Sequence, residues 1–254
     1  LDLAAYDAIC AGPGLGEGEE SIALITKLLE EYEKTLVIDA DGLNVIAHLD
    51  LFPLLLRRQE RFPLRTILTP HMGEAKRLLG DAFADVVRDE AAGQAAAEDD
   101  LPQDLSDGAV RLRIVDALTA KTGAIVVLKG AGTLVAAPGI QAYTNTTGNP
   151  GMATGGSGDV LSGIITGLAG QRQQAASSKA DTGFQDASPN ADATAETRST
   201  CGLARMSAWD AAIGGVYIHG LAGDLAAQEL GEYGVTAGDL AQYTAYALKQ
   251  ICAE

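Results

Sequence analysis

The chain has 254 residues, 47% hydrophobic and 20% charged, which is the composition of a globular protein able to bury a substantial core. It carries 18 Lys and Arg against 34 Asp and Glu, a formal net charge of -16. A field of that sign repels nucleic acid and anionic membrane surfaces, so we expect neither as a partner. A phosphate-bearing ligand must then be held by local donors, which a short motif should reveal.

The chain contains no apolar stretch of the roughly 20 residues that a membrane span needs, and its first residues lack the pattern of a signal peptide. We therefore expect a cytoplasmic protein. Cys10, Cys201 and Cys252 follow no paired metal-ligand spacing, so we expect no metal site built from protein side chains alone. Because the chain lacks an initial Met and enters a strand-like segment within a few residues, we expect an N-terminally truncated domain.

Short apolar runs alternate with helical patterns along the chain. The runs cover residues 8–11, 36–38, 66–68 and 124–128, and the clearest helical stripes are Ile22, Ile25, Leu28 and Leu29, then Val110, Ile114, Val115 and Leu118. This alternation predicts parallel strands joined by crossover helices. Two further runs, 133–137 and 140–144, are split by Pro138-Gly139 and predict a hairpin, so the sheet should be mixed.

Two segments, 81–108 and 172–205, break this rhythm. The first is acidic and Ala-rich, and the second is dominated by Ala, Ser, Thr, Asp and Gln. We predict flexible insertions, favouring surface disorder over a functional lid, within a single domain that spans residues 1–254. Long helical patterns follow, one after Ser207 and one that begins at Thr236 as an N-cap.

The most informative stretch is NPGMATGGSGDVLSG, which runs from Asn149 to Gly163. Its glycines free backbone N–H groups to face a ligand, and the apolar run that follows begins a helix whose N-terminus carries partial positive charge. Phosphate can bind there without lysine. Asp159, at the start of that helix, could accept a proton from a hydroxyl beside the phosphate, although an isolated carboxylate there is more often a helix cap.

Three more segments follow predicted strands, at the edge where open α/β sheets bind ligands. They are GPGLG at 12–16, TPHMGE at 69–74 with His71 and Glu74, and KGAGT at 129–133. Each is weak alone: the first does not match the dinucleotide fingerprint, a loop histidine is often incidental, and the third could be an ordinary turn.

Together with VIDADGLN at 37–44, these segments resemble, in the same order, the motifs GPGLG, IDADALN, TPHPGE, LKG..T and N.GN.GMA.GGSGDVL.G of the NAD(P)H-hydrate dehydratase family. YIHGLAGD at 217–224 is similar to the family's closing helical region. The resemblance implies a ribokinase-like three-layer α/β/α sandwich with a mostly parallel central sheet. It also implies a homo-oligomer and, in some members, a preceding epimerase domain.

The resemblance further implies the site residues and the reaction. Adenine-nucleotide contacts fall on Lys129, Gly130, Ala131, Gly132, Thr133, Asn149, Gly151, Met152, Ala153, Thr154, Gly155, Gly156, Ser157 and Gly158, and substrate contacts on Gly12, Gly14, Gly16, His71, Glu74 and Asp159. The implied reaction is phosphoryl transfer from ADP or ATP to the ring hydroxyl of the S-form of NAD(P)H hydrate, with Asp159 as the catalytic base, followed by loss of phosphate. Mg²⁺ bound mainly through the nucleotide would share the charge stabilisation.

Two alternatives remain open from the sequence. A ribokinase-like kinase acting on a hydroxymethylpyrimidine, a thiazole alcohol or a sugar also uses a glycine-rich anion site followed by aspartate. The motif GMATGGSGD together with His71 favours the dehydratase. Family members begin with a further segment that nothing here matches, so a nucleotide-binding fragment without turnover is the other alternative. Met72 and Gly42 stand where proline and alanine are commoner, changes that we expect to be minor.

Overall fold

The computed structural model describes residues 2–88, 105–177 and 207–253. Within them a six-stranded sheet has the order β1-β2-β3-β4-β5-β6. The strands are β1 (Ala8–Ala11), β2 (Thr35–Ile38), β3 (Thr66–Leu68), β4 (Ile125–Leu128), β5 (Leu134–Ala137) and β6 (Ile140–Thr144). The first four pair in parallel, and β5 and β6 add an antiparallel hairpin. The predicted strands, hairpin and mixed sheet are therefore confirmed.

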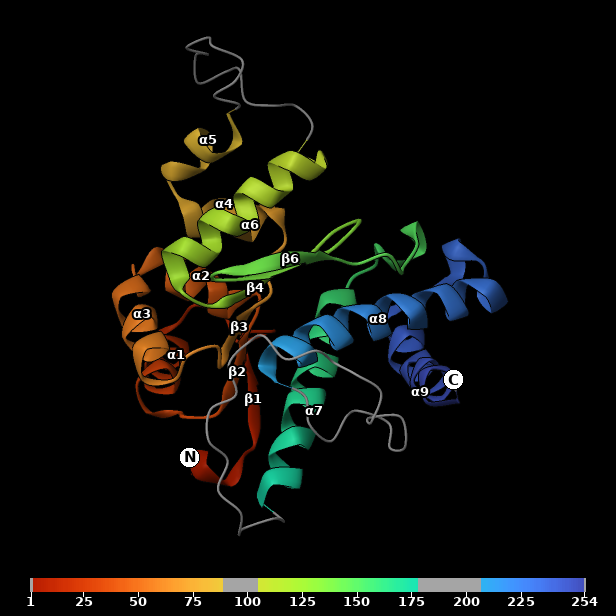
Figure 1. Cartoon of the computed structure of the whole chain (residues 1–254), viewed down its shortest axis with the longest axis horizontal. Helices are drawn as coiled ribbons and strands as arrows, with labels where there is room; N and C mark the ends of the chain where they lie inside the picture. Colours follow the sequence, from red (N-terminus) through yellow and green to blue (C-terminus); the bar gives the residue numbers. More distant parts are fainter. Residues whose placement is uncertain (1, 89–104, 178–206, 254) are drawn as a thin grey trace.

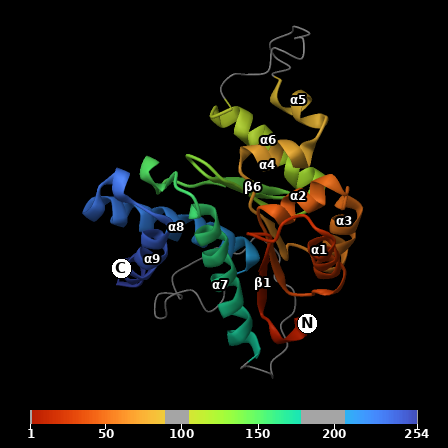
Figure 2. The same ribbon diagram turned by 180° about the vertical axis from the view of Figure 1, so that it is seen from behind.

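Helices connect these strands and cover both faces of the sheet. They are α1 (Glu19–Glu31), α2 (Asp41–His48), α3 (Phe52–Arg61), α4 (Met72–Leu79), α5 (Ala82–Val87), α6 (Gly108–Thr122), α7 (Ser157–Ser177), α8 (Ala208–Leu230) and α9 (Ala237–Ala253), with short 3₁₀ turns η1 (Leu3–Ala5), η3 (Pro150–Met152) and η5 (Glu232–Gly234). Figures 1 and 2 show α1 and α3 on one side of the sheet and α7 on the other. None of the described helices is long and apolar enough to cross a bilayer.

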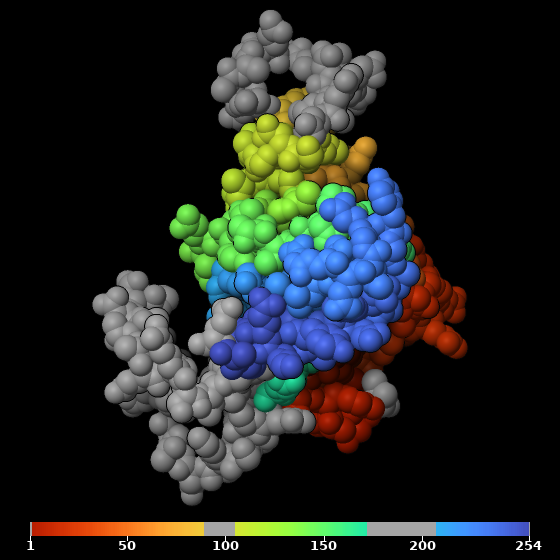
Figure 3. Space-filling view, turned by 90° about the vertical axis from the view of Figure 1, so that its right-hand side faces the viewer, coloured from red at the N-terminus to blue at the C-terminus, as the bar shows by residue number. Residues whose placement is uncertain are grey.

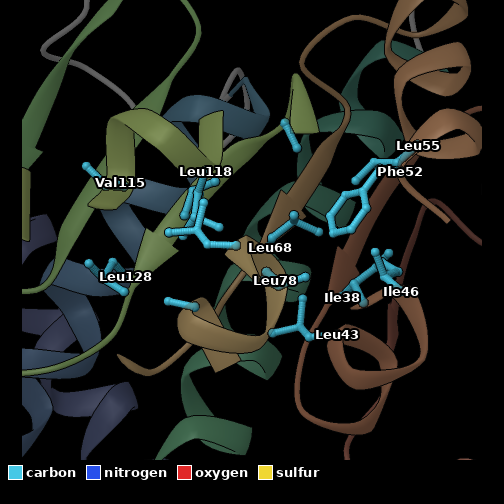
Figure 4. Close-up of a cluster of buried hydrophobic side chains, with 14 of the residues drawn as sticks. Ile38, Leu43, Ile46, Phe52, Leu55, Leu68, Leu78, Val115, Leu118 and Leu128 are labelled. Carbon is cyan, nitrogen blue, oxygen red and sulfur yellow. The ribbon is translucent and has the colours of Figure 1, made fainter. Parts of the chain in front are cut away.

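Strands β2 to β5 are buried at every position and mostly apolar because both faces of the sheet are covered there. On β2, Leu36 and Ile38 pack into the core under α1 to α6, whereas Val37 packs into the opposite core under α7 and α8. Figure 4 shows the first core, in which Ile38, Leu68 and other side chains of the sheet meet those of the covering helices. The chain thus forms the expected three-layer α/β/α sandwich with a mostly parallel sheet.

Helix α5 corrects one boundary of the predicted insertions. Residues 82–87 were expected to lie in a flexible segment, but Phe83 and Val87 lie one helical turn apart and are buried in the core under α1 to α6. Two apolar side chains at this spacing are enough to dock a short helix on an existing core. Likewise, α7 continues to Ser177. Residues 89–104 and 178–206 lie outside the described residues, so the rest of both insertions stays a prediction.

The two C-terminal helices form one side of the molecule. Ala211, Ile218 and Ala222 of α8 pack in one cluster with Ala247 of α9. Trp209, at the other end of α8, packs toward the sheet. Figure 3 shows the surface of these helices beside that of the segment that follows β4. Helix α8 therefore lies between the sheet and α9, next to the segment that follows β4.

Candidate active site

The carboxyl ends of the four parallel strands bring the predicted motifs together. Gly12 follows β1, Asp39 follows β2, His71 follows β3 and Lys129 follows β4. Because these strands are parallel neighbours, the residues after them meet at one edge of the sheet, where ligands bind in folds of this class. The backbone N–H of Lys129 donates to the Pro70 carbonyl over 2.8 Å, which ties two of these ends together.

A buried ionic cluster lies at this edge. Lys129 Nζ is 2.6 Å from Asp39 Oδ1 and 3.8 Å from Glu74 Oε2. The Asp39 side chain is only 1% exposed, and its second oxygen has no hydrogen-bond partner among the described residues. Asp39 lies inside the family-like motif at 37–44 but was not among the predicted site residues. The sequence nevertheless contains a signal for Asp39 as a site residue, because a carboxylate directly follows a buried strand.

His71 caps α4 and is held by Glu74. Its Nδ1 accepts hydrogen bonds from the N–H groups of Gly73 and Glu74, at 2.9 and 3.3 Å, so this nitrogen is unprotonated. Its Nε2 lies 3.3 Å from Glu74 Oε1, and Glu74 Oε2 accepts from the His71 N–H over 2.8 Å. Glu74, predicted to contact substrate, is buried and instead fixes the half-exposed imidazole, with Nε2 carrying the proton.

A cavity of about 670 Å³ opens beside Lys129. This is the size of a site for a small molecule or cofactor. Its lining includes eleven predicted residues: His71, Lys129, Gly130, Ala131, Gly132, Thr133, Asn149, Met152, Ala153, Ser157 and Gly158. It also includes Asn145, Thr146, Thr147, Gly148, Pro150, Leu161, Val216, His219 and Gly220, which the sequence analysis missed. The other predicted site residues, Gly12, Gly14, Gly16, Glu74, Gly151, Thr154, Gly155, Gly156 and Asp159, are not part of this lining.

The first turn of α7 brings the Lys129 ammonium close to a carboxylate without a described partner. A Cβ on Gly158 would lie 3.2 Å from Lys129 Nζ, so the ammonium sits against this turn. Asp159, its third residue, is exposed, and its carboxylate forms no hydrogen bond or ion pair with the residues that the structure describes; only its backbone carbonyl accepts a side-chain hydrogen bond, from Ser162 Oγ. Asp210 and Asp239, third in α8 and α9, both accept hydrogen bonds from the residue before the helix. The Asp159 carboxylate therefore does not cap its helix.

The turn that follows β1 packs against the turn that follows β2. Burial raises the pKa of the Cys10 thiol on β1, hydrogen bonds with the Ser162 and Thr166 side chains lower it in part, and the charges of Asp39 and Asp159 raise it. Gly12 has a φ of 131° and lies so close to Asp39 that an added Cβ would be 1.7 Å from the Asp39 carbonyl oxygen. Only glycine fits there. The turns after β1 and β2 are therefore in direct contact.

Helix α8 holds the loop that forms the far wall of the cavity. Asp224 accepts hydrogen bonds from Gly148 N, at 2.9 Å, and from Asn149 Nδ2, at 3.0 Å. Asn149 Oδ1 accepts from Gly151 N, so both amide atoms of Asn149 are engaged within the protein. Thr147 Oγ1 donates to the Tyr217 carbonyl over 3.0 Å. The stretch 217–224, predicted only to be part of a closing helix, therefore holds this loop in place.

A sequence model of the family described as NAD(P)H-hydrate dehydratase matches residues 1–245. The chain belongs to this family. It is 36% identical over 248 residues to the bifunctional NAD(P)H-hydrate repair enzyme Nnr of Thermofilum pendens, which covers 96% of the chain and 35% of that protein. It is 39% identical over 166 residues to the ADP-dependent (S)-NAD(P)H-hydrate dehydratase of Neisseria meningitidis, with 65% of the chain and 48% of the relative covered.

Two solved structures have folds similar to that of this chain. The Bacillus subtilis ADP/ATP-dependent NAD(P)H-hydrate dehydratase, co-crystallized with ATP/Mg²⁺ and soaked with CoA, superposes with a TM-score of 0.62 at 22% identity, covering 97% of this chain and 67% of that one. A ribokinase-like superfamily protein of Enterococcus faecalis gives 0.64 at 23% identity, covering 99% and 66%. The chain spans about a third of the length of the bifunctional relatives, 35% of the Thermofilum protein.

Gly220 lets α8 pack closely against the loop that contains Thr147. A Cβ there would lie 2.1 Å from Thr147 Oγ1 and 2.7 Å from the Thr147 carbonyl carbon. We expect Gly220→Ala to lower the free energy of unfolding by about 1–3 kcal/mol, measured by urea denaturation. Gly163→Ala, in α7 with open space around it, is the matched control and should raise stability by up to about 1 kcal/mol. Equal free energies of unfolding for the two variants would mean that the close contact between Gly220 and Thr147 does not stabilise the loop.

Proposed function

We propose that this chain converts the S-form of NADH or NADPH hydrate to NADH or NADPH, with ADP or ATP as phosphoryl donor. The observation that carries the proposal is the unengaged Asp159 carboxylate, next in the chain to Gly158, against which the Lys129 ammonium lies, in the first turn of a helix that begins on the cavity wall. The family membership supports the same reaction. A dehydratase acting in this way repairs damaged nicotinamide nucleotides.

The nucleotide occupies the cavity in this proposal. Residues 129–133, the loop before α7 and the first residues of α7 supply backbone N–H groups, and the α7 dipole favours the negative phosphates. Lys129 places a positive charge beside the same turn. These local donors offset the chain's net charge of -16. The size of the cavity also suits a nucleotide.

The hydrate lies toward the end of β1, with its ring hydroxyl near Asp159. The hydroxyl oxygen bonds to the terminal phosphorus of the nucleotide as the bridging P–O bond breaks, and Asp159 takes the hydroxyl proton. Phosphate then leaves with the electrons of the ring C–O bond. Loss of a proton from the adjacent carbon restores the ring double bond. His71, half-exposed on the cavity wall, orients the nicotinamide.

Mg²⁺ fits this site as an ion carried by the nucleotide. The described residues contain no group of three His, Cys, Asp or Glu side chains that could hold a metal. Mg²⁺ commonly keeps several waters and binds substrate phosphates, so the nucleotide can carry it without a protein-only cage. When bound, the ion neutralises charge on the phosphates. An epimerase partner, a homo-oligomeric state and a cytoplasmic location stay predictions.

The first test is recovery of the absorbance of the reduced nicotinamide ring. Purified NADH hydrate is mixed with the chain, Mg²⁺ and either ADP or ATP, with a nucleotide-free reaction as control. We expect absorbance to return only when nucleotide is present, and the faster nucleotide identifies the donor. If no absorbance returns while ADP still raises the melting temperature, the chain is a nucleotide binder or a kinase of another alcohol. Phosphorylation of a pyrimidine, thiazole or sugar alcohol would identify the kinase.

A further inference from the structure

A buried histidine that the proposed reaction does not use lies on the cavity wall. His219, on α8, is 8% exposed, and its Nε2 is 3.4 Å from Ser157 Oγ. Both residues line the cavity. Ser157 is the first residue of α7, so the pair stands where the unpaired N–H groups of that helix begin. Its position suits a role in phosphate binding.

The imidazole of His219 is uncharged. Burial lowers its pKa to about 4, and a hydrogen bond with the Ser157 backbone opposes that shift only in part. The partial positive charge at the start of α7 also disfavours an imidazolium there. A neutral imidazole keeps one N–H, which it can donate, and one unprotonated nitrogen. His219 therefore acts through a hydrogen bond and not through charge.

The direction of that hydrogen bond decides what Ser157 can do. If the serine hydroxyl donated to His219, its only hydrogen would point away from the cavity. If His219 donates, the hydroxyl hydrogen is free to meet an anion. A phosphate beside the helix start needs donors, so the second arrangement is the one that helps binding.

We propose that His219 is a positioning residue for the nucleotide, whose Nε2–H donates to Ser157 Oγ and so turns the Ser157 hydroxyl hydrogen toward a phosphate oxygen. The inference rests on the proposed function, because it takes the cavity to hold a nucleotide. It assigns a role to a residue of α8 that lies 62 positions from its partner in the chain. This hydrogen bond should strengthen the binding of the phosphates and should not affect the binding of the adenosine part of the nucleotide.

The test compares ADP with adenosine, which has no phosphate. His219→Leu keeps an apolar volume without a donor, and His219→Gln offers an amide N–H near the Nε2 position. We expect His219→Leu to weaken ADP binding about tenfold by calorimetry, the effect of one charge-assisted hydrogen bond, and adenosine binding by less than about twofold. His219→Gln should recover most of the ADP affinity. His48→Leu removes an exposed histidine that pairs with Glu17 and should change neither affinity.

Ser157→Ala tests the pairing itself. We expect it to weaken ADP as much as His219→Leu does, and the double variant to bind no worse than either single variant, since both act through one hydrogen bond. Equal losses of ADP and adenosine affinity would overturn the proposal and make His219 a packing residue. Additive losses in the double variant would overturn it too.

The binding assay separates this proposal from the proposed function. A wild-type chain that binds ADP but does not restore NADH refutes the dehydratase activity while the His219 comparison stands. A wild-type chain with turnover, in which His219→Leu leaves ADP affinity unchanged, refutes the positioning role alone. Failure of the wild-type chain to bind ADP at all would overturn both.

Discussion

Asp159→Asn is expected to slow restoration of NADH from its hydrate by about 10²–10⁴-fold, the usual contribution of a general base. The amide has the shape of the carboxylate but cannot accept the proton of the substrate hydroxyl. The Asp159 side chain forms no hydrogen bond or ion pair with the described residues, so its replacement breaks no contact there. ADP affinity should therefore change by less than about threefold, because the N–H groups of the helix remain.

Asp210→Asn is the matched control for this change. Asp210 is also the third residue of a long helix, but its carboxylate accepts hydrogen bonds from the Ser207 hydroxyl and N–H. Its replacement should leave turnover unchanged and lower the free energy of unfolding by about 1 kcal/mol. Steady-state assays measure the turnover of both variants, and calorimetry measures their ADP affinity. Full turnover by Asp159→Asn would place the base elsewhere, and loss of ADP binding would show that Asp159 supports the nucleotide site instead.

The contrast between these aspartates could have been predicted from the sequence. Ser207 and Thr236, before α8 and α9, offer hydroxyls with which Asp210 and Asp239 form caps. Gly156, before α7, has no side chain to pair with Asp159. The absence of a capping hydroxyl therefore distinguishes a free carboxylate from a capping one. The residue type at position 159, taken alone, favours a cap and does not reveal this difference.

The strands were predictable for a local reason. Apolar runs bounded by turn residues mark strands buried on both faces, and this signal needs no knowledge of neighbours. The partners inside the site were not predictable in that way. Lys129 and Asp39 are 90 positions apart, and Asp224 and Gly148 are 76 apart. Only the strand order and the path of α8 bring these residues together, so composition and spacing could not reveal them.

Lys129→Met is expected to lower the free energy of unfolding by about 3–5 kcal/mol in denaturant titrations. The change removes the ammonium 2.6 Å from Asp39 and leaves a carboxylate that is 1% exposed without its cation. Asp39 Oδ1 would keep only the N–H of Ala40, at 2.8 Å, because its other oxygen already lacks a described partner. A buried charge left unpaired in this way is among the most destabilising of changes.

Lys34→Met is the control, since Lys34 pairs with Asp7 at 3.0 Å with both side chains about one third exposed, 31% and 33%. Solvent screens that pair, so the loss should be less than about 1 kcal/mol. Adding Asp39→Asn to Lys129→Met should restore part of the lost stability, because it removes the stranded charge. If Lys129→Met costs no more than Lys34→Met, Asp39 is not held as a buried carboxylate. If the double variant is less stable than Lys129→Met alone, Asp39 stabilises the turn after β2 independently of the lysine.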